Sequence, residues 1–251
     1  MKSITFLLLM VAISLIIPNA GTAAVWVGAQ AGPNFVADGS VKGLGSFQTH
    51  TDITISRLKN VRTEPAVLAG IIVGYDFVKE GFGGYAWPNW LKYFSVAVDL
   101  TYNDFSQKAQ EVQVDSTRGP LTIHITKADG NMITLSLLFM AKYGFFSNPE
   151  YPSGRLIPYV GVGPGLVFSR VDTPSSWSGY PSSDSLEPSI LTEAGIRYMV
   201  LPKVSLDAAF RYRYVYPSYD VDYFSNIGNF HVQGRILAQQ FNAIFRVNYH
   251  F

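Results

Sequence analysis

Hydrophobic and polar residues alternate with a period of two through much of the chain. In residues 237–251, apolar side chains take most odd positions and polar side chains most even positions, with Ala238 and Ile244 as the exceptions. This alternation predicts a β-strand with one apolar and one polar face. The same pattern recurs near residues 24–35, 65–77, 92–103, 133–143, 155–170, 190–198 and 204–216. The sequence therefore predicts eight amphipathic strands.

The connections between these predicted strands alternate in length. Long polar segments follow the first, third, fifth and seventh strands, whereas shorter segments follow the second, fourth and sixth. Outer-membrane barrels show this asymmetry, because their periplasmic turns are short and their external loops are long. A tilted strand crosses a bilayer in about 9–11 residues, which suits the predicted strands. We therefore expect an all-β, eight-stranded antiparallel transmembrane β-barrel, an up-and-down meander with both ends on the periplasmic side.

The first 24 residues have the character of a secretory signal peptide. Lys2 supplies a positive charge, an apolar run extends from Ile4 to Ile17, and the small residues from Gly21 to Ala24 suit cleavage. We expect residues 1–24 to be removed and residues 25–251 to form one outer-membrane β-barrel domain. After this segment, no apolar run is long enough for a membrane-spanning helix.

Composition narrows the possible functions. The 4 Trp, 15 Tyr and 17 Phe residues fit aromatic girdles at two membrane interfaces. With 19 basic and 18 acidic residues the chain is nearly neutral, so we expect no nucleic-acid partner. The absence of cysteine excludes a disulfide framework and a thiolate metal site.

Charged residues on the polar faces of the predicted strands form the candidate functional group. Side chains can nearly fill the interior of an eight-stranded barrel, so isolated charges there would be costly. Asp99, Glu193, Arg211 and Arg246 lie near the middle of their strands, where they can share one layer. We expect ion pairs to close the lumen; the alternative is a wet lumen in which separately solvated charges line a small pore. The predicted lumen charge network consists of Asp76, Asp99, Lys142, Glu193, Arg197, Asp207, Arg211, Arg213 and Arg246.

Aromatic residues near the predicted strand ends are candidates for anchoring at the membrane interface, where flat amphipathic rings are favoured. Trp26, Trp87 and Trp90 could instead bind a ligand, but interface anchoring or filling of the lumen is the simpler interpretation. The predicted interface aromatics are Tyr85, Trp87, Trp90, Tyr212, Tyr214, Tyr249 and Phe251.

The long connections are predicted to lie outside the cell. Residues 36–63 and 217–235 are polar and are expected to be external loops. Residues 105–131 differ from these. Val112 and Val114 fall on even positions, like the apolar residues of the preceding strand. Leu121, Ile123 and Ile125 fall on odd positions, like the apolar residues of the following strand, so neither strand changes its apolar face. We therefore expect the third and fourth strands to continue as one long hairpin that turns near residues 117–120.

Several segments resemble a known family. The stretches WVGAQAGPNF, AGIIVGYDF, PYVGVGPGLVF, AGIRYM, VSLDAAFRYRY and the terminal NYHF resemble the small OmpA/OmpX-like outer-membrane β-barrel superfamily. This resemblance implies location in the outer membrane of a Gram-negative envelope and contact with outer-membrane lipids and lipopolysaccharide. It also implies that the barrel-assembly machinery reads the aromatic C-terminus, although Arg246 stands where that signal usually has glycine. The superfamily includes structural anchors, adhesins, narrow pores and a few lipid-modifying enzymes.

Catalytic residues of such enzymes find no clear counterpart. Lipid A deacylases on similar barrels use a His-x-Ser pair, and none of His50, His124, His231 and His250 begins one. A pair of His50 with Asp52 would suit an outer-membrane protease, but those barrels have more strands and several carboxylates. No acidic cluster has calcium-loop spacing. We predict no catalytic, cofactor-binding or metal-binding residues, with the loop histidines solvated and His250 structural.

These observations favour an integral outer-membrane protein without catalysis. The protein would have a structural role, or it would form a narrow pore. Alternatively, its long connections would bind an unknown extracellular partner. Two alternatives remain open: an enzyme that modifies lipid A or lipopolysaccharide, and a small channel for apolar molecules.

Overall fold

The computed structural model describes residues 25–36, 39–47, 53–61, 63–77, 87–108, 110–116, 119–125, 128–172, 183–215, 218–225, 228–236 and 238–251. The predicted signal peptide and Tyr85 lie outside these residues. A short 3-10 helix, η2 (Asn89–Tyr93), precedes one of the barrel strands. No helix in the described part of the chain is long and apolar enough to cross a membrane.

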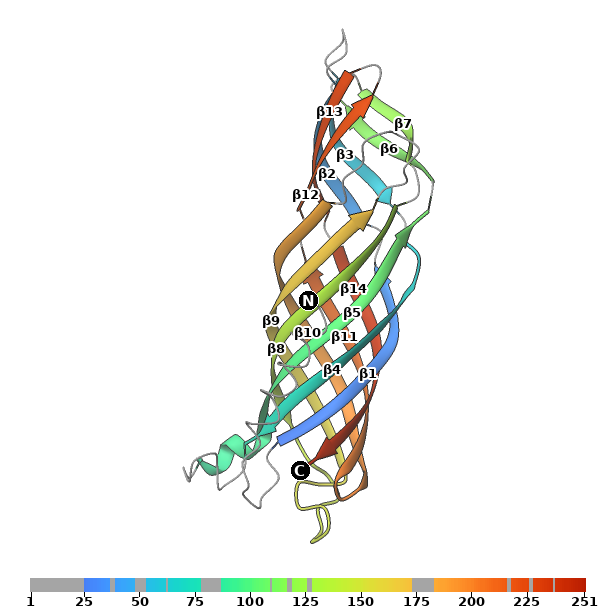
Figure 1. Cartoon of the computed structure of the whole chain (residues 1–251). Coiled ribbons are helices and arrows are strands. Elements are labelled where there is room, and N and C mark those ends of the chain that lie inside the picture. The colour runs from blue at the N-terminus through green and yellow to red at the C-terminus, as the bar shows by residue number, and fades with distance from the viewer. Residues whose placement is uncertain are drawn as a thin grey trace, which may run out of the picture.

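Eight antiparallel strands close into a barrel, which confirms the predicted fold class (Figure 1). Neighbours in sequence pair with each other, and the last strand pairs with the first, for example at Gln30 and Arg246. The barrel strands are β1 (Val25–Val36), β4 (Ala66–Asp76), β5 (Phe94–Gln107), β8 (Ala128–Lys142), β9 (Leu156–Asp172), β10 (Ser183–Leu201), β11 (Val204–Val215) and β14 (Ala238–His250).

Alternation along each strand separates a polar interior from an apolar wall. On β10, Glu193 and Arg197 are buried inside the barrel, whereas Ile190 and Ile196 are more than half exposed on the outside. On β14, Arg246 is buried and its neighbours Phe245 and Val247 are exposed. The backbone of a closed barrel satisfies its own hydrogen bonds, so an apolar outer wall can face lipid without an unpaired edge.

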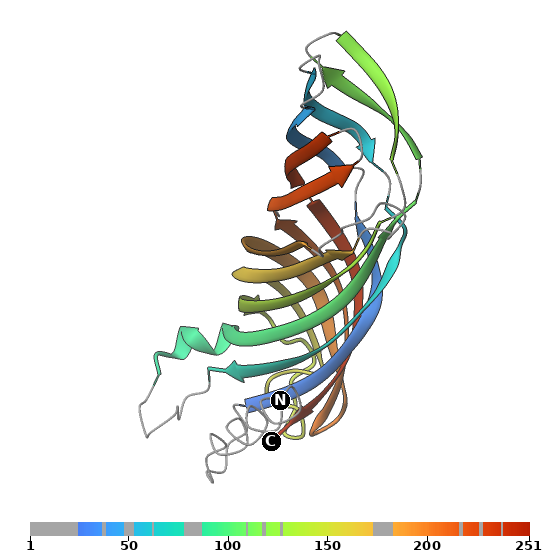
Figure 2. The same cartoon turned by 45° about the horizontal axis from the view of Figure 1, so that its top comes forward.

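The long connections form a second sheet, which was only partly predicted. Six strands pair in the order β12-β13-β2-β3-β6-β7, all at the end of the barrel away from the C-terminus (Figures 1 and 2). They are β2 (Gly39–Phe47), β3 (Ile53–Val61), β6 (Gln110–Ser116), β7 (Gly119–Ile125), β12 (Ser218–Ser225) and β13 (Gly228–Ile236). We refer to these six strands as the outer sheet.

The hairpin predicted within residues 105–131 is confirmed. Gln107 pairs with Ala128 at the end of the barrel, and Gln110 pairs with Ile125 three residues further on, so the register is unbroken. Ser116 pairs with Gly119, which places the turn close to the predicted residues 117–120. Gly119 has φ of 105°, a left-handed conformation that glycine adopts without strain.

The prediction that residues 36–63 and 217–235 are loops is wrong, since most of these residues are in β2, β3, β12 and β13. Their predicted position beyond one end of the barrel is not contradicted. The reason is that backbone pairing propagates from the barrel without needing alternating side chains. Val215 pairs with Ala238 in the barrel and Ser218 with Arg235 in the outer sheet, again in one register. The outer sheet is therefore an extension of the barrel wall.

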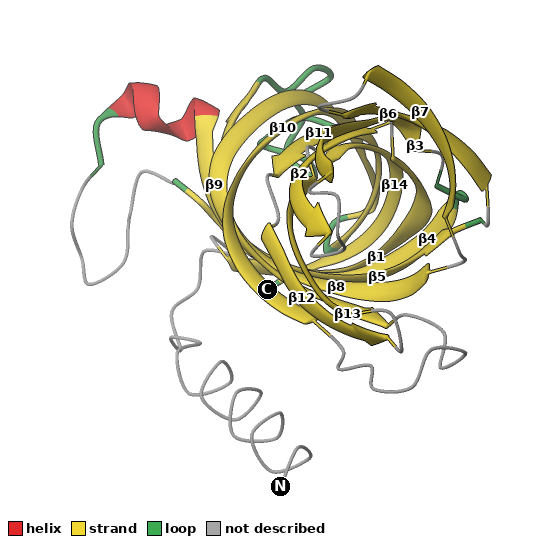
Figure 3. Cartoon of the chain, turned by 90° about the horizontal axis from the view of Figure 1, so that it is seen from above, coloured by secondary structure: helices red, strands yellow, loops and turns green. Residues whose placement is uncertain are grey.

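This extension covers only part of the barrel rim. Its hairpins continue β1 and β4, β5 and β8, and β11 and β14, whereas β9 and β10 have no continuation among the described residues. Seen along the barrel axis, the outer sheet lies over the ring of barrel strands (Figure 3). The described part of the outer sheet thus rises as an open wall with β7 and β12 as its edges.

The opposite end of the barrel has shorter connections than the outer hairpins, with residues 143–155 between β8 and β9 and residues 202–203 between β10 and β11. Between β8 and β9, the backbone N–H of Tyr151 donates to the side chain of Asn148 over 2.7 Å. The guanidinium of Arg155 lies over the rings of Tyr151 and Tyr198, 5.4 and 5.3 Å from their centroids. Short turns mark the periplasmic side of an outer-membrane barrel, so we expect the outer sheet to face the exterior.

Two glycines on β9 give a matched test of the close strand packing. A Cβ on Gly163 would overlap the backbone carbonyl oxygen of Leu137, which cannot move without shifting β8. A Cβ on Gly161 would meet only the ends of the Leu138 and Met140 side chains, at 3.0 and 3.1 Å. We expect Gly163→Ala to lower the free energy of unfolding by about 1–3 kcal/mol, and Gly161→Ala to lower it much less. Urea unfolding in detergent, followed by circular dichroism, would measure both; equal losses would contradict this packing.

Candidate functional site

The barrel interior is the candidate site, because large polar side chains converge there from all eight strands. Trp26, Arg211, Arg213 and Arg246 are among the largest side chains with less than 2% exposure. The interior side chains form two ion-pair clusters, a lower and a central one, with apolar side chains packed against both.

The central cluster is built on two arginines and two carboxylates. Arg211 on β11 donates from Nη1 and Nη2 to the two oxygens of Asp99 on β5, over 3.0 and 2.8 Å. Its Nε donates to Glu193 Oε2 on β10 over 2.8 Å. Arg246 on β14 donates from Nη1 and Nη2 to Glu193 over 2.6 and 2.7 Å. Fork-shaped contacts of this kind are the strongest that arginine makes with carboxylates, and the cluster is neutral overall.

Two neutral side chains complete this cluster. Gln30 on β1 donates from Nε2 to Asp99 over 2.6 Å and accepts from Arg246 Nε over 2.7 Å. The Tyr159 hydroxyl on β9 donates to Glu193 and accepts from Arg246 Nη1, over 3.1 and 2.8 Å. The cluster therefore ties strands on opposite sides of the barrel to one another.

The lower cluster lies nearer the periplasmic end. Lys142 Nζ is 2.6 Å from Asp76 Oδ1, and Arg197 Nε is 3.1 Å from Asp207 Oδ1. Trp26 joins the two pairs, because its Nε1 donates to Asp76 over 3.0 Å and the Arg197 guanidinium lies 4.3 Å from its ring centroid. Trp26 thus fills the lumen and does not lie at the membrane interface.

Apolar side chains pack against members of both clusters. Trp26 packs with Ile72, Leu138 and Leu191, all of them fully buried. A second apolar group, Met132, Val167 and Val215, lies toward the outer end. Because the charges are paired and apolar side chains pack beside them, the interior has the composition of a protein core more than that of an aqueous channel.

Arg213 is the predicted network residue that the structure does not bring to a carboxylate. It is fully buried, and its Nη1 and Nη2 donate to Gln240 and Thr101 over 3.1 and 3.2 Å. Among the described residues, no carboxylate lies within ion-pair distance of its guanidinium. The other eight predicted charges lie in the two clusters.

Sequence reasoning missed the neutral members, Gln30, Tyr159 and Trp26. A signal for them was present, because Gln30 and Trp26 share the inward parity of β1 and Tyr159 that of β9. Charge alone does not identify neutral donors and acceptors on the same faces.

The histidines occupy varied places. His124 and His231 lie in β7 and β13, and His50 and Asp52 lie outside the described residues. His250 is buried at the end of β14, with Nε2 at 3.0 Å from Ser205 Oγ. Ser205 has no exposed surface, and its hydroxyl also accepts from Asn248 Nδ2 over 3.0 Å. A serine in this position is not accessible to a substrate.

The predicted interface aromatics are on the outer face where the structure describes them. Tyr249 and Phe251 form an edge-to-face pair with ring centroids 5.2 Å apart at the periplasmic end. Trp87 packs edge-on against Phe77, and Trp90 against Phe94. Tyr212 and Tyr214 face outward on β11. Their anchoring at a lipid interface stays a prediction.

A closed antiparallel barrel of eight strands, with a polar interior and an apolar outer wall, defines an outer-membrane β-barrel protein. Residues 5–251 match the family described as the outer membrane protein beta-barrel domain. The chain belongs to this family and is a protein of the bacterial outer membrane.

Solved structures of other outer-membrane proteins are similar to this chain. The outer membrane protein OprG of Pseudomonas aeruginosa is 14% identical, with a TM-score of 0.50 over 92% of this chain and 99% of that chain. Neisserial surface protein A is 16% identical, with a TM-score of 0.42 over 92% and 100%. The outer membrane protease OmpT of Escherichia coli is 8% identical, with a TM-score of 0.45 over 93% and 99%. No curated protein matches the sequence. At these identities the likeness concerns the fold alone.

Proposed function

We propose that this protein is a non-catalytic outer-membrane scaffold whose closed barrel carries the outer sheet into the extracellular space. The outer sheet would meet an extracellular partner, and the barrel would hold it rigidly above the membrane. The observation that carries this proposal is the unbroken register between barrel and outer sheet at Gln107–Gln110 and Val215–Ser218.

The packing of the lumen favours a structural role of the barrel over a role as a pore. Arg211 and Arg246 bridge strands across the barrel and bury their charges against Asp99 and Glu193. A conducting lumen would have to hydrate these groups and break contacts that a dry interior strengthens. The burial of Ser205 beside His250 likewise favours a non-catalytic role, because this serine has no access to lipid or peptide.

Labelling of single cysteines on intact cells tests the display of the outer sheet. The natural chain has no cysteine, so each introduced thiol reports alone. We expect a membrane-impermeant maleimide to label Thr122→Cys on β7 in intact cells. Ser147→Cys, in the turn between β8 and β9, should react only after the outer membrane is permeabilised. If Ser147→Cys alone were labelled in intact cells, the barrel would have the opposite orientation in the membrane, and the proposal would be refuted.

Two measurements separate the alternatives. Chemical analysis of lipid A and phospholipids from cells with and without the protein should show no difference; a protein-dependent change in acylation would establish an enzyme. Liposome swelling with small sugars should match protein-free liposomes, whereas fast swelling would establish a pore.

A further inference from the structure

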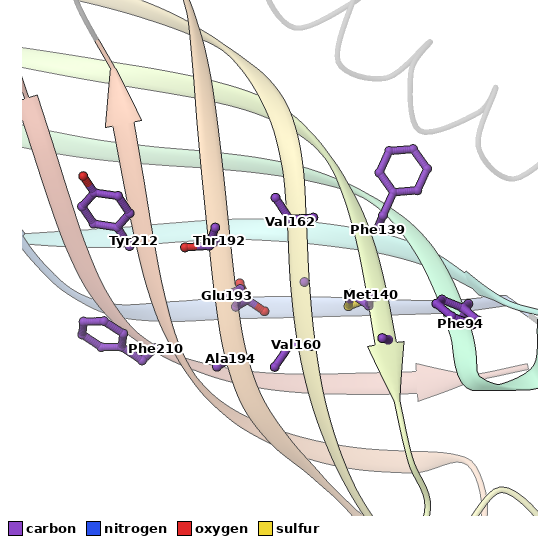
Figure 4. Close-up of a pocket in the computed structure, with 12 residues that line it drawn as sticks. Phe94, Phe139, Met140, Val160, Val162, Thr192, Glu193, Ala194, Phe210 and Tyr212 are labelled. Carbon is purple, nitrogen blue, oxygen red and sulfur yellow. The ribbon is translucent and has the colours of Figure 1, made fainter.

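The lipid-facing wall carries a groove across β8, β9, β10 and β11. Its volume is about 610 Å³, and its lining is almost entirely apolar. Figure 4 shows Phe94 and Phe139 on one side of it and Phe210 and Tyr212 on the other, with Val160, Val162, Thr192 and Ala194 between.

Strand register explains why the wall is hollow here. Phe94 pairs with Ala141, Ala141 with Val160, Val160 with Ala194, and Ala194 with Phe210. One row of outward side chains therefore reads large, small, small, small, large across five strands. Rings at both ends and small side chains in the middle leave a concave apolar surface between the rings.

A polar pocket of about 250 Å³ lies at the periplasmic rim beside this groove. Lys92, Tyr93, Tyr143 and Ser147 are among its lining residues. The rings of Tyr93 and Tyr143 stack with centroids 5.8 Å apart, and Lys92 Nζ lies 5.0 Å from the Tyr93 ring centroid. Lys92 is exposed, and no carboxylate of the described residues lies within ion-pair distance of it.

The groove and the pocket have lining residues that are neighbours in sequence at two places. Tyr93 lines the pocket and the next residue, Phe94, lines the groove; on β8, Ala141 lines the groove and Lys142 and Tyr143 line the pocket. The resulting site is apolar within the membrane and basic at the level of the periplasmic headgroups. The membrane itself covers this wall, so the occupant comes from the lipid that surrounds it.

We propose that this wall binds one glycerophospholipid of the periplasmic leaflet, with an acyl chain in the groove and the phosphate beside Lys92. Lipid tails gain no hydrophobic energy by leaving other tails, so affinity must come from the fit of the chain into the concave surface. The Lys92 ammonium supplies attraction to the phosphate. This site does not depend on the proposed function of the outer sheet.

Native mass spectrometry of the purified protein with dioleoyl phosphatidylglycerol tests the site. We expect one lipid to stay bound to the wild type after the detergent is removed. Ala194→Phe, which fills the groove, should reduce this adduct to the level of non-specific binding. Lys92→Gln should weaken it about five-fold, but should leave binding of dioleoylglycerol, which has no phosphate, unchanged.

Matched controls change the same side chains elsewhere on the barrel. Ala208→Phe adds a ring to an outward position of β11 outside the groove, and Lys203→Gln removes an exposed charge from the next periplasmic turn. Both should retain the lipid, and heat-modifiable gel mobility should show that all four variants are folded. Equal lipid binding by all variants would show that the bound lipid belongs to the non-specific shell around the barrel. Loss of a dimer, and not of lipid, in Ala194→Phe would mean that a second copy fills the groove; either result overturns the proposal.

Discussion

Arg211→Ala is expected to lower the free energy of unfolding by about 3–5 kcal/mol, the typical cost of breaking a buried ion pair. The arginine holds two carboxylates, Asp99 and Glu193, with three hydrogen bonds between 2.8 and 3.0 Å. Its removal leaves the Asp99 charge with Gln30 alone and leaves Glu193 with Arg246 and Tyr159. Urea unfolding of the protein in lipid vesicles, followed by circular dichroism, would measure the loss.

The control for this variant is Arg170→Ala. Arg170 lies on the outer end of β9 with its side chain about half exposed, 3.9 Å from the more exposed Asp184. Exposed ion pairs contribute little, so we expect a change within about 0.5 kcal/mol. If Arg211→Ala were no more destabilising than Arg170→Ala, the lumen charges would have to be solvated and the central cluster would not exist as described.

Trp26→Ala is the second change with a large expected effect. The Trp26 side chain is fully buried, packs against Ile72 and Leu138, and contacts both ion pairs of the lower cluster. Deleting a buried tryptophan side chain typically costs about 3–5 kcal/mol. Loss of the indole N–H also removes a hydrogen bond from Asp76. Gel-shift assays of folded and unfolded protein during urea titration would measure the change without relying on tryptophan fluorescence.

Trp90→Ala is the matched control for that variant. Trp90 is 59% exposed on helix η2, where its ring contacts Phe94 only at the edge. Its removal should cost far less than that of Trp26 in the same assay. Similar losses for the two tryptophans would indicate that Trp26 does not fill the lumen.

The sequence was sufficient to predict the barrel because each barrel strand has one face toward lipid and one toward a filled lumen. That constraint imposes alternation of apolar and polar residues. The alternation predicted that Glu193, Arg211 and Arg246 face the lumen. The outer sheet has no such lipid constraint, and residues 36–63 and 217–235 read as loops for that reason. Only residues 105–131 kept enough parity to reveal their hairpin.

The exact pairing inside the lumen was beyond the sequence for a different reason. Parity tells which residues face inward, but which of them meet depends on the stagger between strands around the barrel. Arg211 reaches Asp99, 112 residues away, because the barrel closes at one particular stagger. The same stagger leaves Arg213 with Gln240 and Thr101 in place of a carboxylate.

The central claim, that paired charges and apolar side chains fill the lumen, is tested most directly by the electrical conductance of the wild-type protein in a planar lipid bilayer. The described packing predicts that insertion of folded protein adds little or no steady current. Reproducible single-channel steps of stable amplitude, blocked or altered by Arg211→Ala, would contradict it and show that ions pass through the central cluster.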